Sequence, residues 1–369
     1  MDVFKFNNPT APTKMEAGVI INDLKSKMWI ERYAQAGEFK FVADAKSGIR
    51  TELPIGSFVS HVDTSEIMIV ENHEISDNVN SNPEIVITGR GFETYFENRI
   101  VGSNRIHPSY DGVSEFILAP NYLWIQIATL IQQHIYATNL LDDDDAVPFV
   151  SAVVSVSGVG EVLSRSVKRG DLYTRMLELL AIENLGVKVI RPGPWSPLGA
   201  GSPNTAVMIH VGVNRTGEII FSHDTGEIES ADYLWSNKKN KNAALIAGRW
   251  VETEVTGPET LYNRRTMFVD ASDIDNSYSV APTGADLAAI VYAMRQRGLE
   301  ALATQNDVAL TKAQVSKNNK KAAYRKDFDV GDLISVHGSF NESTIFRVSE
   351  YVEIEDNTGS SGYPTLTVI

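Results

Sequence analysis

Alternating apolar and polar residues in the first hundred positions predict a run of short antiparallel strands. Phe39 and Phe41 alternate with charged residues, which is the period-two pattern of a strand with one buried face. A turn at residues 34–37 joins this strand to another around Trp29. Further strands are expected at 55–60, 67–71 and 85–91, followed by a short helix at 92–99. The side chains expected to point into this β-domain are Trp29, Phe39, Phe41, Phe58 and Ile69.

Three later segments have helical periodicity. Residues 121–141 repeat apolar side chains at Leu123, Ile127, Leu130 and Ile131. A helix over 170–184 would bury Leu172, Met176, Leu179 and Leu180, with Gly186 as its C-terminal signal. The segment from Thr283 to Asp286 has the form of a capping box, and Leu287, Ile290, Val291 and Met294 follow at helical spacing.

Strand-like segments separate these helices. They are expected at 147–156, 187–190, 243–255 and 264–269, with a hairpin over 205–221 that turns at 214–217. The Pro/Gly-rich stretch at 192–203 is a candidate inter-domain or interaction loop.

Composition and charge narrow the class of protein. A chain of 369 residues with 43% hydrophobic residues predicts a folded protein of two or three domains. The net charge of −14, without a basic block, argues against a nucleic-acid-binding protein, because neutralising phosphates needs clustered Lys and Arg. There is no cysteine, so disulfides and thiolate metal sites are excluded.

No segment has the sequence features expected of membrane insertion. Residues 1–9 hold no apolar region typical of a secretory signal. Residues 116–141 are uncharged, but Pro120, Gln126 and His134 interrupt them, so a buried or interface helix is favoured over a spanning one.

Two charged runs are candidate ion or nucleic-acid sites. The oxygens of Asp142, Asp143, Asp144 and Asp145 suit a hard cation, but the spacing and glycine of a calcium loop are missing, which favours a solvated loop. The basic residues within 317–321 are also better interpreted as a solvated loop, because a nucleic-acid site needs more charge and aromatic residues.

Sequence motifs of catalysis are absent. The chain has no G-x-S-x-G, H-E-x-x-H or P-loop, and Gly158–Gly160 and Gly199–Gly201 are poor phosphate loops. The seven histidines (61, 73, 107, 134, 210, 223 and 337) lack metal-type i, i+4 pairing. His210, His223 and Asp224 would share the predicted hairpin, where polar ends of a surface turn explain them better than catalysis. Carboxylate pairs suited to glycoside hydrolysis stay open, since their separation is three-dimensional. No residue is therefore assigned a catalytic, cofactor-binding or metal-binding role.

A weak internal repeat links the two ends of the chain. In the first copy, a loop separates residues 56–60 (GSFVS) from Glu71. In the second copy, a loop four residues longer separates residues 331–335 (GDLIS) from Glu350. Five positions are identical in this register. Two explanations are open. The match can arise by chance between two strand–loop–strand units, or the two segments can belong to a pair of related β-barrels.

Two blocks of the sequence resemble the baseplate-hub, or minor tail, protein family of long-tailed phages. The first block holds the 29–41 hairpin, residues 69–71 (IVE) and residues 88–91 (TGRG). The second holds residues 268–273, 297–302, 328–332 and 347–350, in the family's order. Residues 110–262 do not contribute to the resemblance.

The resemblance implies a mainly β protein with an α+β insert. It would comprise a first tail-tube-like β-barrel at 1–110, a mixed α/β middle region at 111–262, and a helix with a second, related barrel at 263–369. The implied function is a structural virion protein, made in the host cytoplasm. It would be a homotrimeric hub that joins the hexameric tail tube to the trimeric tip and lines the channel for genome ejection. The implied partners are distal-tail or tube, tape-measure and tip or fibre proteins, with DNA only in transit and no cofactor. A receptor- or carbohydrate-binding tail module and a cell-wall-degrading tail enzyme remain alternatives.

Overall fold

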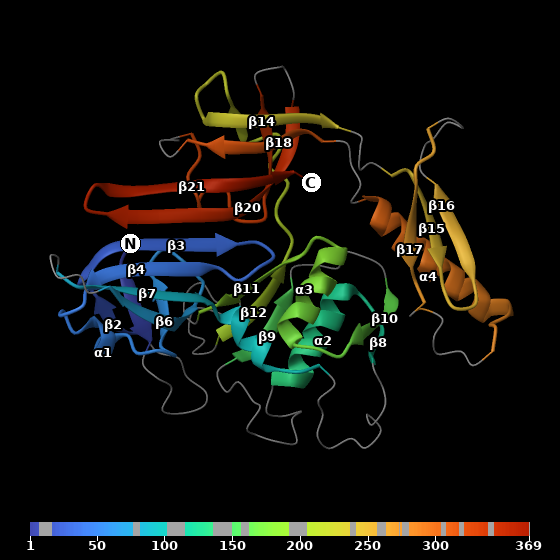
Figure 1. Cartoon of the computed structure of the whole chain (residues 1–369), viewed down its shortest axis with the longest axis horizontal. Helices are drawn as coiled ribbons and strands as arrows, with labels where there is room; N and C mark the ends of the chain where they lie inside the picture. Colours follow the sequence, from blue (N-terminus) through green and yellow to red (C-terminus); the bar gives the residue numbers. More distant parts are fainter. Residues whose placement is uncertain are drawn as a thin grey trace. The chain divides into compact units, whose positions relative to one another are not determined.

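A computed structural model gives the architecture of the chain (Figure 1). It describes residues 1–6, 17–76, 82–101, 115–135, 150–155, 162–191, 205–236, 241–256, 263–272, 274, 280–303, 308–316, 321–338 and 343–368. The chain forms two compact units. Unit 1 contains residues 1–230 and 313–367, and unit 2 contains residues 231–312.

The described chain is mainly β, as predicted, and thirteen of its strands belong to one sheet. The order along this sheet is β14-β18-β21-β20-β3-β4-β7-β6-β5-β1-β2, with β19 beside β20 and β13 beside β19. The strands are β1 Val3–Phe6, β2 Ala17–Ile21, β3 Leu24–Arg32, β4 Glu38–Asp44, β5 Phe58–His61, β6 Met68–Ser76, β7 Glu84–Gly91, β13 Ile220–Ser222, β14 Ile228–Ser236, β18 Val308–Val315, β19 Leu333–His337, β20 Ser343–Asp356 and β21 Gly359–Val368. β14 leads from unit 1 to unit 2, and β18 leads back.

The two ends of the chain share this sheet instead of forming separate barrels. β20 pairs with β3 in antiparallel register, with Glu353 opposite Trp29, as Figure 1 shows for the neighbouring red and blue strands. β20 has fourteen residues. This length lets its first half pair with β19 and its second half with β3. The described strands do not close into the two predicted β-barrels, because β20 connects both sets of strands.

The predicted hairpin around residues 34–37 is confirmed, but the predicted core divides between two faces. Trp29, Phe39 and Phe41 pack in one buried cluster. Phe58 belongs to a second cluster, and the half-buried Ile69 packs against it. Side chains alternate along a strand, so the neighbours of these two residues, Val59, Met68 and Val70, complete the Trp29 cluster instead.

A helical layer covers the second cluster. The short helix α1 Ile49–Glu52 is not part of this layer, since its Ile49 packs in the Trp29 cluster. The layer comprises the 3₁₀ helix η1 Phe92–Asn98, α2 Leu123–Ile135 and α3 Leu172–Ile182. Two small sheets accompany it, β10 (Leu163–Lys168) with β8 (Glu115–Asn121), and β11 (Gly186–Ile190), β12 (Thr205–His210) and β9 (Val150–Ser155) in that order. The predicted inward residues of α2 and α3 are buried.

Local signals mark both ends of the α3 helix. The carboxylate of Asp171 accepts a hydrogen bond from the Thr174 amide at 2.7 Å. Asn184, with φ 51°, takes the left-handed conformation after the helix. The predicted signal, Gly186, instead begins β11 and lies against the ring of Tyr33.

The predicted hairpin over 205–221 is wrong. β12 pairs in parallel with β9 and antiparallel with β11, whereas β13 pairs in parallel with β19. The turn-like residues 214–217 do form a local turn, in which Asn214 Oδ1 accepts from Thr216 N at 3.1 Å. They lead the chain from one sheet to another, and long-range pairing overrides the local turn signal.

Between β14 and β18, the described residues of unit 2 form a three-stranded sheet with one helix. β15 (Ala243–Ala247) lies between β16 (Glu252–Thr256) and β17 (Thr266–Asp270), and α4 runs from Gly284 to Ala303. Ile290 and Met294 on α4 pack against Ala244, Ile246 and Val255. The predicted strands and helix of this region are confirmed.

The internal repeat has the same backbone hydrogen bonds in both copies. Gly56 N donates to Val70 O at 2.8 Å, and Val70 N donates to Ser57 O at 2.9 Å. Gly331 N donates to Val348 O at 2.7 Å, and Val348 N donates to Asp332 O at 2.9 Å. Both glycines have positive φ, 85° and 100°. The two units therefore share a turn-strand-strand geometry.

Candidate functional site

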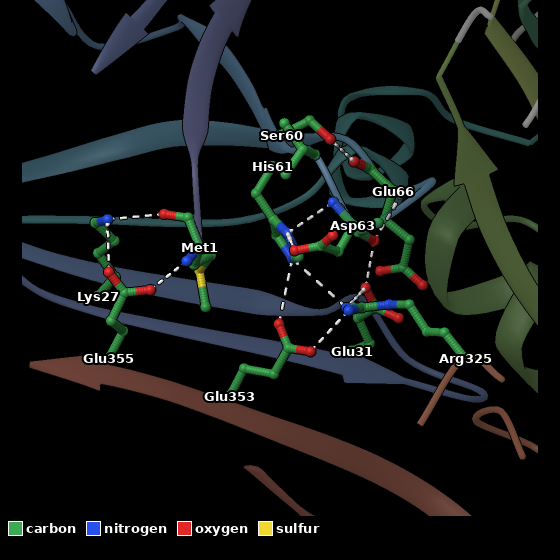
Figure 2. A network of polar contacts seen from close by, with 12 residues as sticks. Met1, Lys27, Glu31, Ser60, His61, Asp63, Glu66, Arg325, Glu353 and Glu355 are labelled. Carbon is green, nitrogen blue, oxygen red and sulfur yellow. Dashed lines mark hydrogen bonds and ion pairs between the residues drawn. The ribbon is translucent and has the colours of Figure 1, made fainter. Parts of the chain in front are cut away.

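A buried polar cluster joins the N-terminal and C-terminal parts of unit 1. We define it as Glu31, His61, Thr64, Tyr324, Arg325 and Glu353, which come from β3, β5, the β5–β6 loop, the segment before β19, and β20. Figure 2 shows Glu31, His61 and Glu353 arranged around the Arg325 guanidinium. We call these six residues the Glu31 cluster.

Glu31 is the best-bonded carboxylate of the cluster. It is 4% exposed and accepts from Tyr324 OH at 2.6 Å, from Arg325 Nη2 at 2.7 Å and from the Thr64 hydroxyl. Burial opposes its ionisation, but Arg325 and the hydroxyl donors outweigh burial and lower the pKa of Glu31 to about 2. Glu31 is therefore a buried anion that keeps its charge across the ordinary pH range.

Arg325 bridges two carboxylates. Its Nη1 donates to Glu353 Oε1 at 2.7 Å, while Nη2 donates to Glu31. The backbone of Arg325 has φ 62°, which is unusual for a residue other than glycine. The preceding Tyr324 stacks on Tyr351 of β20, with ring centroids 3.7 Å apart. The charged contacts and the ring contact together fix this strained turn on the sheet.

His61 is neutral in the cluster. Its Nδ1 accepts from the Asp63 amide at 3.3 Å, which places the ring proton on Nε2, 3.4 Å from Glu353 Oε2. Burial, followed by the nearby Arg325 charge, lowers the pKa of His61 to about 3. His61 thus acts as a fixed hydrogen-bonding group against Trp29, whose ring lies 5.0 Å away, edge to face.

A second group of buried charges borders the Glu31 cluster on the side of β11. Lys188 Nζ lies 3.6 Å from Asp329 Oδ2, and burial of Lys188 is outweighed by Asp329, Glu66 and Glu31, so its pKa is raised. Glu93 Oε1 accepts from the Val189 amide at 2.6 Å. Burial raises the pKa of Glu93 to about 7. Burial, with repulsion from Glu31 and Glu93, raises the pKa of Glu66 well above its usual range.

Tyr33, two residues after Glu31, makes aromatic packing contacts that join the same parts of unit 1. Added Cβ atoms at Gly186 or Gly331 would overlap its ring, so both glycines allow close packing. Its hydroxyl donates to Asn184 O at 2.7 Å, and the Arg347 guanidinium lies 4.6 Å from the ring centroid. Tyr33 therefore contacts β11, the turn before β19, and β20 at one point.

The Glu31 cluster is a structural contact that holds distant parts of the chain together. Its charges are paired or hydrogen-bonded, and its histidine is buried and neutral. The sequence pattern does not reveal this cluster, because Tyr324 and Arg325 lie almost 300 positions from Glu31. The one available signal was a charged residue, Glu31, next to the apolar positions Trp29 and Ile30 of a predicted strand.

The histidines considered from the sequence serve local packing where they are described. His210 is buried beside Tyr33, with ring centroids 5.1 Å apart, and burial lowers its pKa to about 3. His223 and Asp224 follow β13, and because the predicted hairpin is absent they are not paired with His210 through it. His73 Nε2 lies 2.8 Å from Leu53 O, and His134 Nδ1 lies 2.7 Å from Leu130 O.

Several candidate segments fall outside the described residues. They are Asp142–Asp145, the Pro/Gly loop 192–203, Gly158–Gly160, Gly199–Gly201, His107 and residues 317–320 of the basic run. Lys321 is described, and its Nζ donates to Ile220 O at 2.9 Å and lies 3.6 Å from Glu227 Oε1.

The described ranges contain no group of three or more His, Asp or Glu side chains placed to hold a metal ion. They also contain no helix with the length and hydropathy needed to cross a membrane. In the described part of the 116–141 segment, α2 has seven buried residues among its thirteen.

The fold is that of phage tail proteins of known structure. A tail protein from Neisseria meningitidis MC58 aligns with TM-score 0.60 and 12% identity, covering 95% of this chain and 94% of that one. The prophage MuSo2 tail protein from Shewanella oneidensis aligns with TM-score 0.59 and 14% identity over 100% and 97%. Prophage tail protein gp18 from Listeria monocytogenes EGD-e aligns with TM-score 0.59 and 13% identity over 99% and 94%. Sequence comparison with curated proteins gives no significant match.

Residues 14–366 match the family described as Siphovirus ReqiPepy6 Gp37-like protein, and the chain belongs to that family. The family is one of siphoviruses, and together with the tail-protein fold it confirms the predicted resemblance to a protein family of long-tailed phages.

Proposed function

We propose that this chain is the structural adaptor at the tail tip, a homotrimeric hub between the tail tube and the tip proteins. Membership of a siphovirus tail-protein family carries the proposal. The Glu31 cluster supports it, because it locks distant parts of the chain together and offers no reactive group in the open. In this proposal the protein works by geometry, with no chemical step and no cofactor.

The repeated unit gives the adaptor a way to mate different symmetries. Gly56 and Gly331 begin two turn-strand-strand units with the same hydrogen bonds in one chain. Three copies of the chain would present six such units. A ring of this kind suits a six-fold tube on one side and a three-fold tip on the other.

The charge of the chain supports a role beside passing DNA. With a net charge of −14, the protein repels phosphate on average, so DNA can pass without being retained. We propose that acidic residues outnumber basic ones on the surface that faces the channel. The neighbours in this proposal are the tail tube or distal tail protein, the tape-measure protein and tip or fibre proteins.

A density map of the virion tail tip tests this function. We expect three copies of the chain around the tail axis at the end of the tube. A lone copy, or a ring of six copies, would overturn the adaptor proposal. Binding of isolated protein to glycans, or hydrolysis of cell-wall polymer by it, would support the alternative tail functions instead.

The charge argument has its own test. Purified protein should not retard duplex DNA in a gel-shift assay at physiological salt. The matched measurement at low salt gives the salt dependence that phosphate contacts would cause. Retardation that weakens as salt rises would remove the charge argument and leave the adaptor proposal resting on the family alone.

A further inference from the structure

Unit 2 has one sheet face that no described element covers. Leu245 on β15 lies directly opposite Phe268 on β17 and opposite Glu254 on β16, so these three side chains share a face. Phe268 is 66% exposed and Leu245 is 37% exposed. The helix α4 packs on the other face, through Ala244 and Ile246. We call the exposed side the bare sheet face.

Carboxylates surround the apolar centre of the bare sheet face. In the next row of side chains, Ala247 lies opposite Glu252 on β16 and Asp270 on β17. Glu252 and Asp270 are exposed, and Glu254 forms an ion pair with Arg264. The face therefore suits an occupant that combines apolar side chains with positive charge.

The outer side of α4 has that chemistry. Tyr292, Arg295 and Leu299 follow at i, i+3 and i+7 and form one exposed stripe. Tyr292 is 48% exposed and Leu299 is 47% exposed, and the inward side of the helix is lined by Ile290 and Met294. Arg295 has no ion-pair partner among the described residues. We call Tyr292, Arg295 and Leu299 the α4 stripe.

We propose that the α4 stripe of one copy docks on the bare sheet face of unit 2 in a second copy. The contact would bury Tyr292 and Leu299 against Leu245 and Phe268 and bring Arg295 to the carboxylates. Packing a helix on an open sheet face is a common way to bury the apolar side chains of both elements. Unit 2 already packs α4 on its other sheet face in this way.

A second copy of the chain accounts for both exposed patches, whereas a different partner accounts for only one. One foreign protein on the bare sheet face would leave the α4 stripe exposed, whereas a neighbouring copy satisfies both patches at once. The two patches differ, so the contact is heterologous, and it closes into a ring when the rotation between copies permits. The number of copies in that ring rests on the proposed function, while the contact itself does not.

The absence of cysteine in the chain makes a cross-linking test direct. Tagged full-length Phe268→Cys is mixed with untagged Leu299→Cys and treated with a short bis-maleimide, and only tagged–untagged dimers are counted. We expect this pair to cross-link strongly. The matched control replaces Leu299→Cys with Val280→Cys, which is also in unit 2 and 71% exposed but lies on neither patch.

Charge reversal tests the electrostatic part of the contact. Arg295→Glu in the Leu299→Cys chain, or Glu252→Lys in the Phe268→Cys chain, should each lower the cross-linking yield about two- to fivefold. Combining the two variants should restore it. All these positions are exposed, so unchanged thermal melting shows that each variant is folded.

A cross-linking yield no higher than that of the Val280→Cys control overturns the proposal. A combined charge variant whose yield stays as low as that of the single variants also overturns it. Light scattering on the same samples separates this result from the proposed function. A trimer that does not cross-link through these positions refutes the contact and leaves the homotrimeric hub standing.

Discussion

Glu31 and Arg325 lie 294 positions apart in the chain and are joined by a hydrogen bond of 2.7 Å between Arg325 Nη2 and Glu31 Oε1. Their side chains are 5% and 20% exposed. Both have further polar partners, Tyr324 for Glu31 and Glu353 for Arg325. This mostly buried pair, with its further polar partners, fixes the turn before β19 onto β3.

Removing one partner of this pair should destabilise unit 1 strongly. Arg325→Met leaves the Glu31 carboxylate buried without its cation, and we expect a loss of about 3–5 kcal/mol in the free energy of unfolding. Met keeps the same backbone preference as Arg at φ 62°, so backbone strain is unchanged. Urea denaturation measures the effect.

Two further variants show whether the lost stability comes from the buried charge pair. The double variant Glu31→Gln with Arg325→Met should lose clearly less than the two single losses added together, because the buried Glu31 charge is removed together with its cation and only Glu353 is left unpaired. Arg175→Met, which breaks a partly exposed pair with Glu178, should change stability by about 1 kcal/mol or less. Additive losses in the double variant would show that the two residues act independently.

The two repeat glycines should respond differently to alanine. Gly56 has φ 85° and open space around its Cα, so Gly56→Ala should cost about 1–2 kcal/mol from the left-handed backbone alone. Gly331 has φ 100°, and an added Cβ would overlap the Tyr33 ring. Gly331→Ala should therefore cost a further 1–3 kcal/mol or so, in the same denaturation assay.

A second variant isolates the steric part of this difference. In a Tyr33→Ala background the added cost of Gly331→Ala should fall toward that of Gly56→Ala, because the ring that blocks the Cβ is gone. Equal costs at the two glycines in the wild-type background would contradict the close packing of Gly331 on Tyr33.

Local periodicity predicted the elements of this fold but not their pairing. The hairpin of β3 and β4, the helix α3 and the strands of unit 2 follow from apolar spacing and turn residues alone. The pairing of β20 with β3 does not, because any two β-strands with one apolar face are compatible in sequence. This pairing is what replaced two expected barrels with one sheet.

The repeat shows how close a sequence match can come to the structural one. Identity placed Glu71 opposite Glu350, with a loop four residues longer in the second copy. Hydrogen bonds instead match Val70 with Val348, which makes the difference three residues. With Val70 matched to Val348, Glu71 corresponds to Ser349, so the glutamate identity is one residue out of structural register.

Truncating the aromatic core of the β3–β4 hairpin should destabilise unit 1. Trp29 and Phe41 are fully buried, so Trp29→Ala and Phe41→Ala should each cost about 3–5 kcal/mol. Val280→Ala is the control, since Val280 is 71% exposed and its truncation should change stability little. Melting curves of the two core variants that match wild type would refute their packing.

The buried carboxyls give the stability of unit 1 a defined pH dependence. Glu93 has its pKa raised from 4.5 to about 7 by burial, and the pKa of Glu66 is also raised. At these two carboxyls the folded state therefore binds more protons than the unfolded state between pH 4.5 and 7, so their contribution to stability falls as pH rises through this window. For Glu93 the full effect is roughly 3 kcal/mol. Glu31 acts oppositely, because its pKa is lowered to about 2, and its contribution is lost as pH falls from 4.5 toward 2.

His61 and His210 oppose the carboxyls, because burial lowers the pKa of each to about 3 and their contribution is lost as pH falls from 6.5 toward 3. The effect of Glu93 is therefore measured as the difference in the free energy of unfolding between Glu93→Gln and wild type. Glu93→Gln keeps an oxygen that can accept from the Val189 amide but cannot ionise, so its stability relative to wild type should rise between pH 5 and 7 and exceed that of wild type at pH 8. The exposed Glu74→Gln should leave the profile unchanged. Urea denaturation from pH 3 to 9 measures all three proteins. A difference that stays constant from pH 5 to 8 would show that the Glu93 carboxyl is ionised in the folded protein without cost.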